Sequence, residues 1–264
     1  MSFRALHIPG NPLVMPNPWD VGSAVMLQSL GAKALGSTSA GAAFSVGQCD
    51  GTLDLAQKLA NAVAINKATD VPVSADLENG GGDSAEDAAD AIRAAAGARL
   101  AGASIEDLGK DPADPIYPFN LALARVEAAV EAARDTGVLL TARSEGLLTG
   151  TLTLAQVAAR IRAFAQAGAD VVFAPGLKTS EDVKTIMEAA GDTPVSVLIG
   201  SNQTDLTVAN LTSLGVARIS FGSGLARLAY GAVIAMMRDA VAGGAFDYPD
   251  ATASFQEIET LLKR

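Results

Sequence analysis

Carboxylates follow two short apolar stretches of the sequence, and an arginine follows a third. Asp76 and Glu78 end the first stretch, Glu106 ends the second, and Arg143 ends the third. Alternation of side chains along a strand is expected to put Asp76 and Glu78 on the same side, with Leu77 facing away. Crowded carboxylates repel one another unless a cation or a proton lies between them. Their hard oxygen atoms suit Mg²⁺ or Mn²⁺ better than Zn²⁺, which favours the His and Cys clusters that this chain lacks. The pattern therefore predicts a Mg²⁺ (or Mn²⁺) site.

Arg143 has two possible roles at such a site. It could neutralise a neighbouring carboxylate, or its planar fork could hold a substrate carboxylate in a bidentate pair. We favour the second role, because an acidic protein needs a fixed positive group to bind an anionic substrate. Asp107, next to Glu106, is expected to be an ordinary solvated loop residue or a helix cap.

Two further segments offer weaker signals. Residues 36–42 are small and could form a loop that presents backbone N–H groups and a hydroxyl to an anion. Asp50 precedes a helical pattern and would serve equally well as its N-cap, so spacing alone leaves its role open. His7 and Cys49 are the single histidine and the single cysteine, and the position of His7 before the first predicted strand argues against a His-based catalytic triad.

The acidic and basic side chains need a scaffold that brings the three stretches together. Short runs rich in Val, Ile and Leu alternate with longer Ala-rich stretches at helical spacing. The predicted strands lie near 13–16, 34–38, 72–76, 102–105, 138–142, 170–174, 195–199 and 217–220. The predicted helices cover 22–30, 53–68, 84–96, 120–135, 153–167, 179–190 and 205–213, with a further Ala-rich helix after 223.

Eight β/α units in a chain of 264 residues predict an α/β fold of the (β/α)8 TIM barrel type, with a doubly wound sheet as the alternative. Because the carboxyl ends of barrel strands form one rim, the acidic and basic groups should meet there. Ser84 with Asp87, and Thr179 with Asp182, are expected to cap two of the helices. No linker divides residues 1–264, so one domain is expected.

Composition narrows the function classes. With 49% hydrophobic residues the chain should fold, and its net charge of −10 argues against nucleic-acid or anionic-membrane partners. Its apolar runs are too short to cross a bilayer. No signal-peptide pattern is present, and one cysteine cannot form an internal disulfide, so a cytoplasmic location is expected.

Eight segments resemble the isocitrate lyase and phosphoenolpyruvate mutase superfamily, in order and over most of the chain. They are PNPWDVGSA (16–24), GSTSAGAA (36–43), GQCDG (47–51), VSADLENG (73–80), GASIEDLG (102–109), LTARSEG (140–146), GADVVFAPG (168–176) and GVARISFG (215–222). The resemblance implies an α/β barrel whose last helix is swapped between subunits. We therefore expect a homodimer or homotetramer, in which the helices at about 223–264 pack on a partner subunit.

The resemblance also implies three groups of site residues. The Mg²⁺ ligands would be Asp50, Asp76, Glu78 and Glu106. The substrate-binding residues would be Trp19, Ser39, Ala40, Gly41 and Arg143. The catalytic residues would be Glu106, Lys110 and Arg143. In the family's common chemistry, the cation polarises a 2-oxo or enol oxygen and stabilises an enolate while a C–C or C–P bond breaks.

The loop after Glu106 departs from the family pattern. Lyases for isocitrate and methylisocitrate carry a Lys-Lys/Arg-Cys-Gly-His loop there, whereas residues 108–117 contain no Cys or His and offer only Lys110 as a cation. Arg143 is followed by Ser-Glu in place of the usual Thr-Asp, and residues 174–176 read Ala-Pro-Gly where the lyases often place a Glu. We expect residues 108–118 to act as a short lid; the alternative is a plain surface connection.

These observations favour one function and leave two alternatives. The favoured one is a Mg²⁺-dependent enzyme that forms the enolate of a small 2-oxo or 2-hydroxy carboxylic acid and cleaves a C–C bond, as a lyase or decarboxylase. The first alternative is a phosphonopyruvate-type C–P mutase or hydrolase. The second is a protein that binds 2-oxo acids without turnover.

Overall fold

Eight parallel strands form the centre of the computed structural model, which describes residues 2–201, 206–246, 248, 250 and 252–263. They are β1 (Leu13–Met15), β2 (Leu35–Gly36), β3 (Val73–Asp76), β4 (Gly102–Glu106), β5 (Leu139–Arg143), β6 (Val171–Phe173), β7 (Val195–Leu198) and β8 (Arg218–Ser220). The sheet order is β1-β8-β7-β6-β5-β4-β3-β2. The Gly36 N–H donates to the Pro16 carbonyl at 3.1 Å and so links the two outer strands. The sheet is a nearly closed barrel, which confirms the predicted (β/α)8 TIM barrel.

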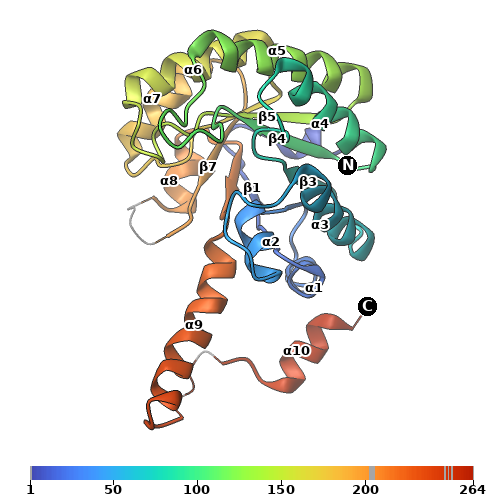
Figure 1. The fold of residues 1–264 in the computed structure, drawn as a ribbon, viewed down its shortest axis with the longest axis vertical. Helices are drawn as coiled ribbons and strands as arrows, with labels where there is room; N and C mark the ends of the chain where they lie inside the picture. The colour runs from blue at the N-terminus through green and yellow to red at the C-terminus, as the bar shows by residue number, and fades with distance from the viewer. Residues whose placement is uncertain (1, 202–205, 247, 249, 251, 264) are drawn as a thin grey trace.

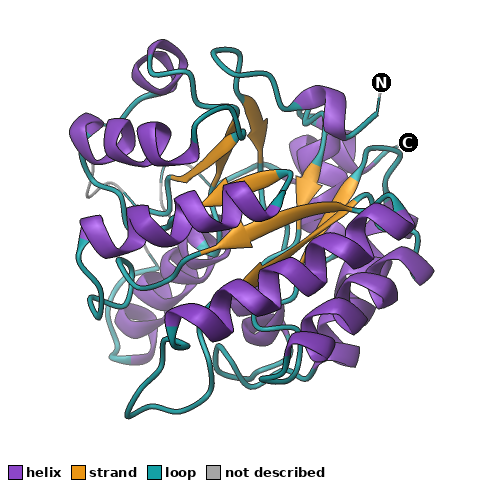
Figure 2. Cartoon of the chain, turned by 90° about the horizontal axis from the view of Figure 1, so that it is seen from above, coloured by secondary structure: helices purple, strands orange, loops and turns teal. Residues whose placement is uncertain are grey.

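Helices alternate with the strands and surround them (Figures 1 and 2). They are η1 (Arg4–Leu6), α1 (Val21–Ser29), α2 (Ser39–Ser45), α3 (Leu55–Ala68), α4 (Ala85–Gly97), α5 (Phe119–Thr136), α6 (Leu154–Ala167), α7 (Ser180–Ala190), α8 (Val208–Ser213), α9 (Gly224–Val241) and α10 (Phe255–Leu262). The predicted elements match within about three residues at each end; residue 205, where one predicted helix starts, lies outside the described residues. Ser84 and Thr179 each form the expected capping box.

One local prediction was wrong, and one of the roles left open for Asp50 is excluded. The small-residue segment 36–42 is not a loop throughout, because α2 begins within it at Ser39. The Thr38 side chain caps this helix by accepting a hydrogen bond from the Gly41 N–H at 3.3 Å. Asp50 is not the N-cap of the following helix. Asp54 takes that position and accepts from the Gln57 N–H at 2.8 Å.

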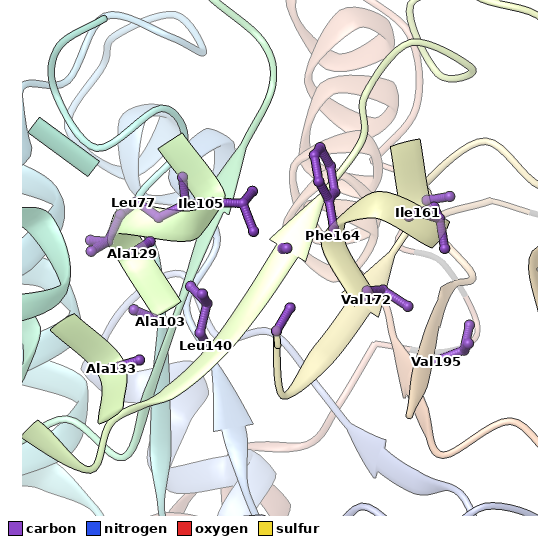
Figure 3. Packing of buried hydrophobic residues seen from close by; sticks show 14 of the residues in the cluster. Leu77, Ala103, Ile105, Ala129, Ala133, Leu140, Ile161, Phe164, Val172 and Val195 are labelled. Atoms are coloured by element: carbon purple, nitrogen blue, oxygen red, sulfur yellow. The ribbon is translucent and has the colours of Figure 1, made fainter. Parts of the chain in front are cut away.

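Two apolar layers hold the barrel together. Between strands and helices, side chains such as Ile105, Leu140 and Val172 pack against Ala129 and Phe164 (Figure 3). Inside the barrel a second cluster closes the amino-terminal end of the strands. Its buried members, here called the apolar plug, are Phe3, Leu13, Met15, Ala34, Leu139 and Val171. A cavity can therefore open only toward the carboxyl ends of the strands.

The C-terminal helices leave the barrel. In Figure 1, α9 projects away from it and α10 lies back toward α1, where the Ser29 hydroxyl donates to the Leu261 carbonyl at 2.7 Å. Ala226 is the one buried residue of α9, and apolar side chains farther along are exposed, among them Leu228, Val233 and Ile234. None of the described helices combines the length and apolar character that a membrane span requires.

Candidate active site

A cavity of about 750 Å³ opens at the carboxyl ends of the strands. Its acidic lining residues are Asp50, Asp76, Glu78, Glu106 and Glu145, and its basic ones are Lys110, Arg143 and Arg218. With every group ionised, this lining carries a net charge of −2. The predicted rim of acidic and basic side chains is therefore present, and it is negative overall.

Arg143 lies among three of these carboxylates. Its Nη1 donates to Asp76 Oδ1 at 2.7 Å, and its Nε and Nη2 donate to Glu145 Oε1 at 2.9 and 2.7 Å. Its Nη2 also lies 3.2 Å from Glu106 Oε2. The structure thus shows Arg143 neutralising carboxylates, which the sequence left as the less favoured role. Binding of a substrate carboxylate by Arg143 stays a prediction.

Asp76 ends β3 and is held in its ionised form. Its Oδ2 accepts hydrogen bonds from the N–H and the hydroxyl of Ser39, both at 3.0 Å, and Ser104 approaches its Oδ1 at 3.4 Å. Burial opposes ionisation, but the positive Arg143 and the Ser39 hydrogen bonds outweigh it and lower the pKa of Asp76. An ionised carboxylate that could bind a cation therefore lies at the end of β3.

Glu106 ends β4, and one of its carboxylate oxygens accepts no hydrogen bond within the described part of the chain. It is 6% exposed, and its Oε2 accepts no hydrogen bond from the described residues. Burial raises the pKa of Glu106 well above its usual range, although Arg143 opposes that shift. A buried carboxylate oxygen without a donor is expected to take a proton or a cation.

Glu78 differs from the expectation that it follows Asp76 along one strand face. β3 ends at Asp76, and Glu78 adopts a left-handed backbone conformation with φ 52°. Its Oε2 lies 2.5 Å from the Nζ of Lys58, whose side chain is 2% exposed. Leu77 is fully buried and faces away, as predicted. Glu78 still lines the cavity, but its charge is already balanced from α3.

Sequence reasoning missed Lys58, although a signal was available. The buried positions of α3 are Lys58, Ala62, Ile65 and Ala68, and this spacing is the inward stripe of a helix. A lysine on that stripe must meet an acid inside the protein.

Asp107 and Arg160 form a buried support beneath the site. Asp107 is 2% exposed and accepts from the Glu145 N–H at 2.7 Å, the Ser144 hydroxyl at 2.9 Å and Arg160 Nη1 at 3.1 Å. The expectation that Asp107 is a solvated loop residue or a helix cap was therefore wrong: it is buried in an ion pair with Arg160, and it fixes the backbone of Glu145. Glu145 itself is a site residue that the sequence presented only as a departure from the family pattern.

Asp50 and Lys110 lie at the edge of the cavity. Asp50 lies at the rim with its side chain open to solvent. The surrounding protein still displaces part of its water, and this desolvation, followed by repulsion from Glu78 and Asp76, raises its pKa. Lys110 belongs to a loop that is pinned to itself by a bridge between Leu108 and Ile116. This loop borders the cavity, as a lid would, and its closure stays a prediction.

The two other predicted binding segments are only partly in place. Ser39 and Ala40 line the cavity, whereas Trp19 and Gly41 are outside the lining. A Cβ atom added to Gly41 would come within 2.8 Å of Trp19 Cβ and 2.6 Å of Thr38 Cγ2. Trp19 therefore packs behind α2 and supports it, and binding of substrate by Trp19 stays a prediction.

A divalent cation fits this site by donor type and charge. Among the described residues no three carboxylate, imidazole or thiol groups are gathered closely enough to hold a metal, because Arg143 lies between them. The donors are nonetheless all hard oxygens, the fully ionised lining is negative by two charges, and Glu106 Oε2 accepts no hydrogen bond in the described structure, although Arg143 Nη2 lies 3.2 Å from it. These features suit Mg²⁺ rather than Zn²⁺.

Comparison with known proteins places this geometry in context. Residues 3–241 match the sequence model of a family described as phosphoenolpyruvate phosphomutase. An uncharacterized Mycobacterium tuberculosis protein is 35% identical over 228 residues, which cover 84% of this chain and 82% of that protein.

Two solved structures share the whole architecture. A Burkholderia cenocepacia protein described as a candidate lyase/mutase is 40% identical, with a TM-score of 0.91 over 98% of this chain and 93% of that chain. A 2,3-dimethylmalate lyase is 28% identical, with a TM-score of 0.83 over 98% of this chain and 93% of that one.

Proposed function

Since the chain belongs to the phosphoenolpyruvate phosphomutase family of the isocitrate lyase and phosphoenolpyruvate mutase superfamily, we propose that it is a Mg²⁺-dependent lyase or decarboxylase. Its substrate would be a small 2-oxo or 2-hydroxy carboxylic acid. The superfamily contains lyases, mutases and hydrolases. The observation that carries the proposal is the group of Asp76, Glu106 and Glu145 around Arg143, with one buried carboxylate oxygen left without a donor.

The chain's residues divide the work of the reaction. Asp76 would hold the cation directly, with Glu106, Glu78 and Asp50 acting beside it or through water. When bound, Mg²⁺ would supply an electrophile that polarises the oxygen at C2 of the substrate and stabilises an enolate. Arg143 would hold the carboxylates in place and bind a carboxylate of the substrate.

The remaining residues would bind the carboxylate of the substrate and transfer a proton. Ser39 and Ala40 line the cavity where α2 begins and would bind the substrate carboxylate. No Cys or His is among the described residues that line the cavity, so the acid/base group differs from the cysteine of the isocitrate and methylisocitrate lyases. We assign proton transfer to Lys110, which lines the cavity from the loop side.

One observation favours the C–P alternative. Lys110 is a cation at the cavity edge, where it could help to stabilise a phosphoryl group during transfer. Phosphate release from a phosphonate substrate would establish that branch.

We also propose that α9 and α10 pack on a second copy of the chain. The support is the exposed apolar surface of α9, which extends away from its own barrel (Figure 1). Contiguous apolar surface of this kind is typical of subunit interfaces. A homodimer or homotetramer would cover it.

The proposal is tested with a panel of 2-hydroxy, 2-oxo and phosphonate acids. Release of pyruvate, glyoxylate and phosphate is measured with Mg²⁺ and with EDTA. We expect product only with Mg²⁺, and a loss of about 100-fold or more in Asp76→Asn, because that change removes a charged ligand. Arg93→Gln on the outer face of α4 is the matched control and should keep full activity. Absence of any product, together with absence of divalent-ion binding by calorimetry, would overturn the proposal.

A further inference from the structure

A second arginine lies inside the barrel, below the carboxylates. Arg218 is the first residue of β8 and is 4% exposed, yet it lines the cavity. Its Nε donates to the Ser196 hydroxyl at 2.9 Å and its Nη2 to the Thr141 hydroxyl at 3.1 Å. Its Nη1 lies 3.4 Å from the Nε2 of His7. These contacts hold the guanidinium just above the apolar plug.

Every one of these partners is neutral. His7 Nδ1 lies 3.0 Å from the Phe3 carbonyl, so that nitrogen carries the proton and Nε2 is left to accept from Arg218. Burial, followed by the nearby charge of Arg218, lowers the pKa of His7 to about 4. Burial, followed by repulsion from Arg143, lowers the pKa of Arg218 to about 9. At neutral pH the result is a positive guanidinium bonded to uncharged groups.

Arg218 also lacks the carboxylate partners that Arg143 has. Among the described residues no carboxylate oxygen lies within 4.0 Å of the Arg218 guanidinium, whereas three carboxylates lie that close to Arg143. An arginine has five N–H donors, and the described structure uses three of those of Arg218. An unpaired buried charge is strongly unfavourable. The two remaining donors therefore call for an anion.

The walls between the two arginines are polar. Barrel interiors are usually filled by layers of Val, Ile and Leu. Here the lining at this depth includes the hydroxyl residues Ser74, Ser104, Thr141 and Ser220. The cavity therefore continues inward from the carboxylates and reaches Arg218.

The depth of this extension follows from β5. Thr141 carries no charge but touches Arg218, and Arg143 lies two residues farther along the same face of that strand. The Cα atoms of Thr141 and Arg143 are therefore about 7 Å apart. A chain of three or four carbon atoms with an acidic group at each end can bridge that distance. Each C–C bond contributes ~1.5 Å and each charged hydrogen bond about 2.8 Å.

We propose that Arg218 binds the second acidic group of a dianionic substrate and is therefore a specificity-determining residue. Such a substrate is a 2-oxo or 2-hydroxy acid with a carboxylate or a phosphonate at the far end of a short carbon chain. This inference rests on the proposed function, because it assumes that the first carboxylate is bound at the level of Arg143. It assigns Arg218 the choice between dianionic and monoanionic substrates.

Three matched ligands test the proposal. 2-Hydroxybutyrate, malate and 3-phosphonolactate share one 2-hydroxy acid end and differ only in a terminal methyl, carboxylate or phosphonate. Calorimetric titrations with Mg²⁺ present should show malate or 3-phosphonolactate binding about 10- to 100-fold more tightly than 2-hydroxybutyrate. The tighter of the two identifies the acidic group. In Arg218→Gln this advantage should disappear while binding of 2-hydroxybutyrate and of Mg²⁺ is kept, and Arg218→Lys should restore part of it.

A measurement on the unmodified protein covers the case in which the variants do not fold. His7 is the single histidine and contacts Arg218, so its imidazole NMR signals should move more with the favoured dianion than with 2-hydroxybutyrate. Arg93→Gln removes a surface ion pair between Arg93 and Glu86 on α4, and it should leave the ligand preference unchanged.

The outcomes separate the two proposals. Equal affinity for all three ligands, no detectable binding of any, or a preference that survives Arg218→Gln would overturn the role of Arg218. A clear preference for a dianion without turnover of any acid would support Arg218 as the binding group and would contradict the proposed lyase activity alone.

Discussion

Replacement of Arg143 by Gln is the sharpest test of the charge balance in the cavity. The Arg143 side chain is 15% exposed and contacts Asp76, Glu106 and Glu145. Removing one partner of a buried ion pair costs 3–5 kcal/mol of the free energy of unfolding, because the other charge is left unpaired. We expect a loss of about 3 kcal/mol, at the low end of that range, since Gln still donates a hydrogen bond and the cavity admits water. For a chain of this size that loss lowers Tm by about 6 to 12 °C.

Mg²⁺ should compensate for this loss. The variant's lining carries one more net negative charge than the wild type, and Arg143 no longer lies between the carboxylates. A cation present at 100 times its Kd stabilises the folded state by about 2.7 kcal/mol. We therefore expect Mg²⁺ to raise the Tm of Arg143→Gln by more than it raises that of the wild type.

The assay is thermal unfolding at neutral pH in EDTA and in saturating Mg²⁺. Arg93→Gln is the control, because Arg93 pairs with Glu86 and Asp90 at the surface, where ion pairs contribute little, so its Tm should stay close to that of the wild type. An unchanged Tm for Arg143→Gln in EDTA, or equal Mg²⁺ effects on variant and wild type, would refute this account of the site.

Three further predictions concern other parts of the chain. The pKa of His7 is about 4 in the folded protein and about 6.5 when unfolded, so its contribution of about 3 kcal/mol is complete above pH 6.5 and is lost as pH falls toward 4; an NMR titration midpoint near 6.5 would contradict this. Ile234→Asp on the exposed face of α9 should shift the oligomer toward monomer in sedimentation, and an unchanged sedimentation coefficient would argue against that interface. Lys110→Ala should lower turnover by about 100-fold or more and leave the Mg²⁺ affinity unchanged, whereas a fully active variant would exclude Lys110 from catalysis.

The barrel could be predicted from the sequence because each strand carries its own signal. Runs such as 138–142 and 170–174 are apolar and bounded by Gly, Asp or Arg, and all eight strands lie where such runs predict them. The exception in detail is α2. Its small residues show no helical pattern, and the helix depends on the Thr38 cap and on close packing of Gly41 against Trp19.

The meeting of Asp76, Glu106 and Arg143 was also predictable. Neighbouring parallel strands end at one rim, and the register pairs Glu106 with Arg143 directly. The partner of Glu78 was not predictable in the same way. Glu78 lies past the end of β3 and turns toward α3, so the alternation of side chains along a strand no longer applies to it.

Arg218 was harder to recognise, because it belongs to a strand motif that is otherwise apolar. Its importance depends on what is missing around it, and only the folded structure shows that Ser196, Thr141 and His7 are its partners. A charged residue within a buried strand is nevertheless a signal. Such a charge must have either a partner in the protein or a ligand.

Arg143 and Arg218 make the two ends of the cavity electrostatically different. Around Arg143 three carboxylates outnumber one guanidinium, so the mouth is negative and attracts a cation. Around Arg218 a positive charge meets only neutral groups, so the base attracts an anion. A substrate with one acidic group could satisfy either level but not both. A substrate with two acidic groups can bind the cation and Arg218 at the same time. If its two acidic ends differ in length or chemistry, it can bind in a single orientation. The bond to be broken would then lie between the two levels, where the hydroxyls of Ser104 and Thr141 line the wall.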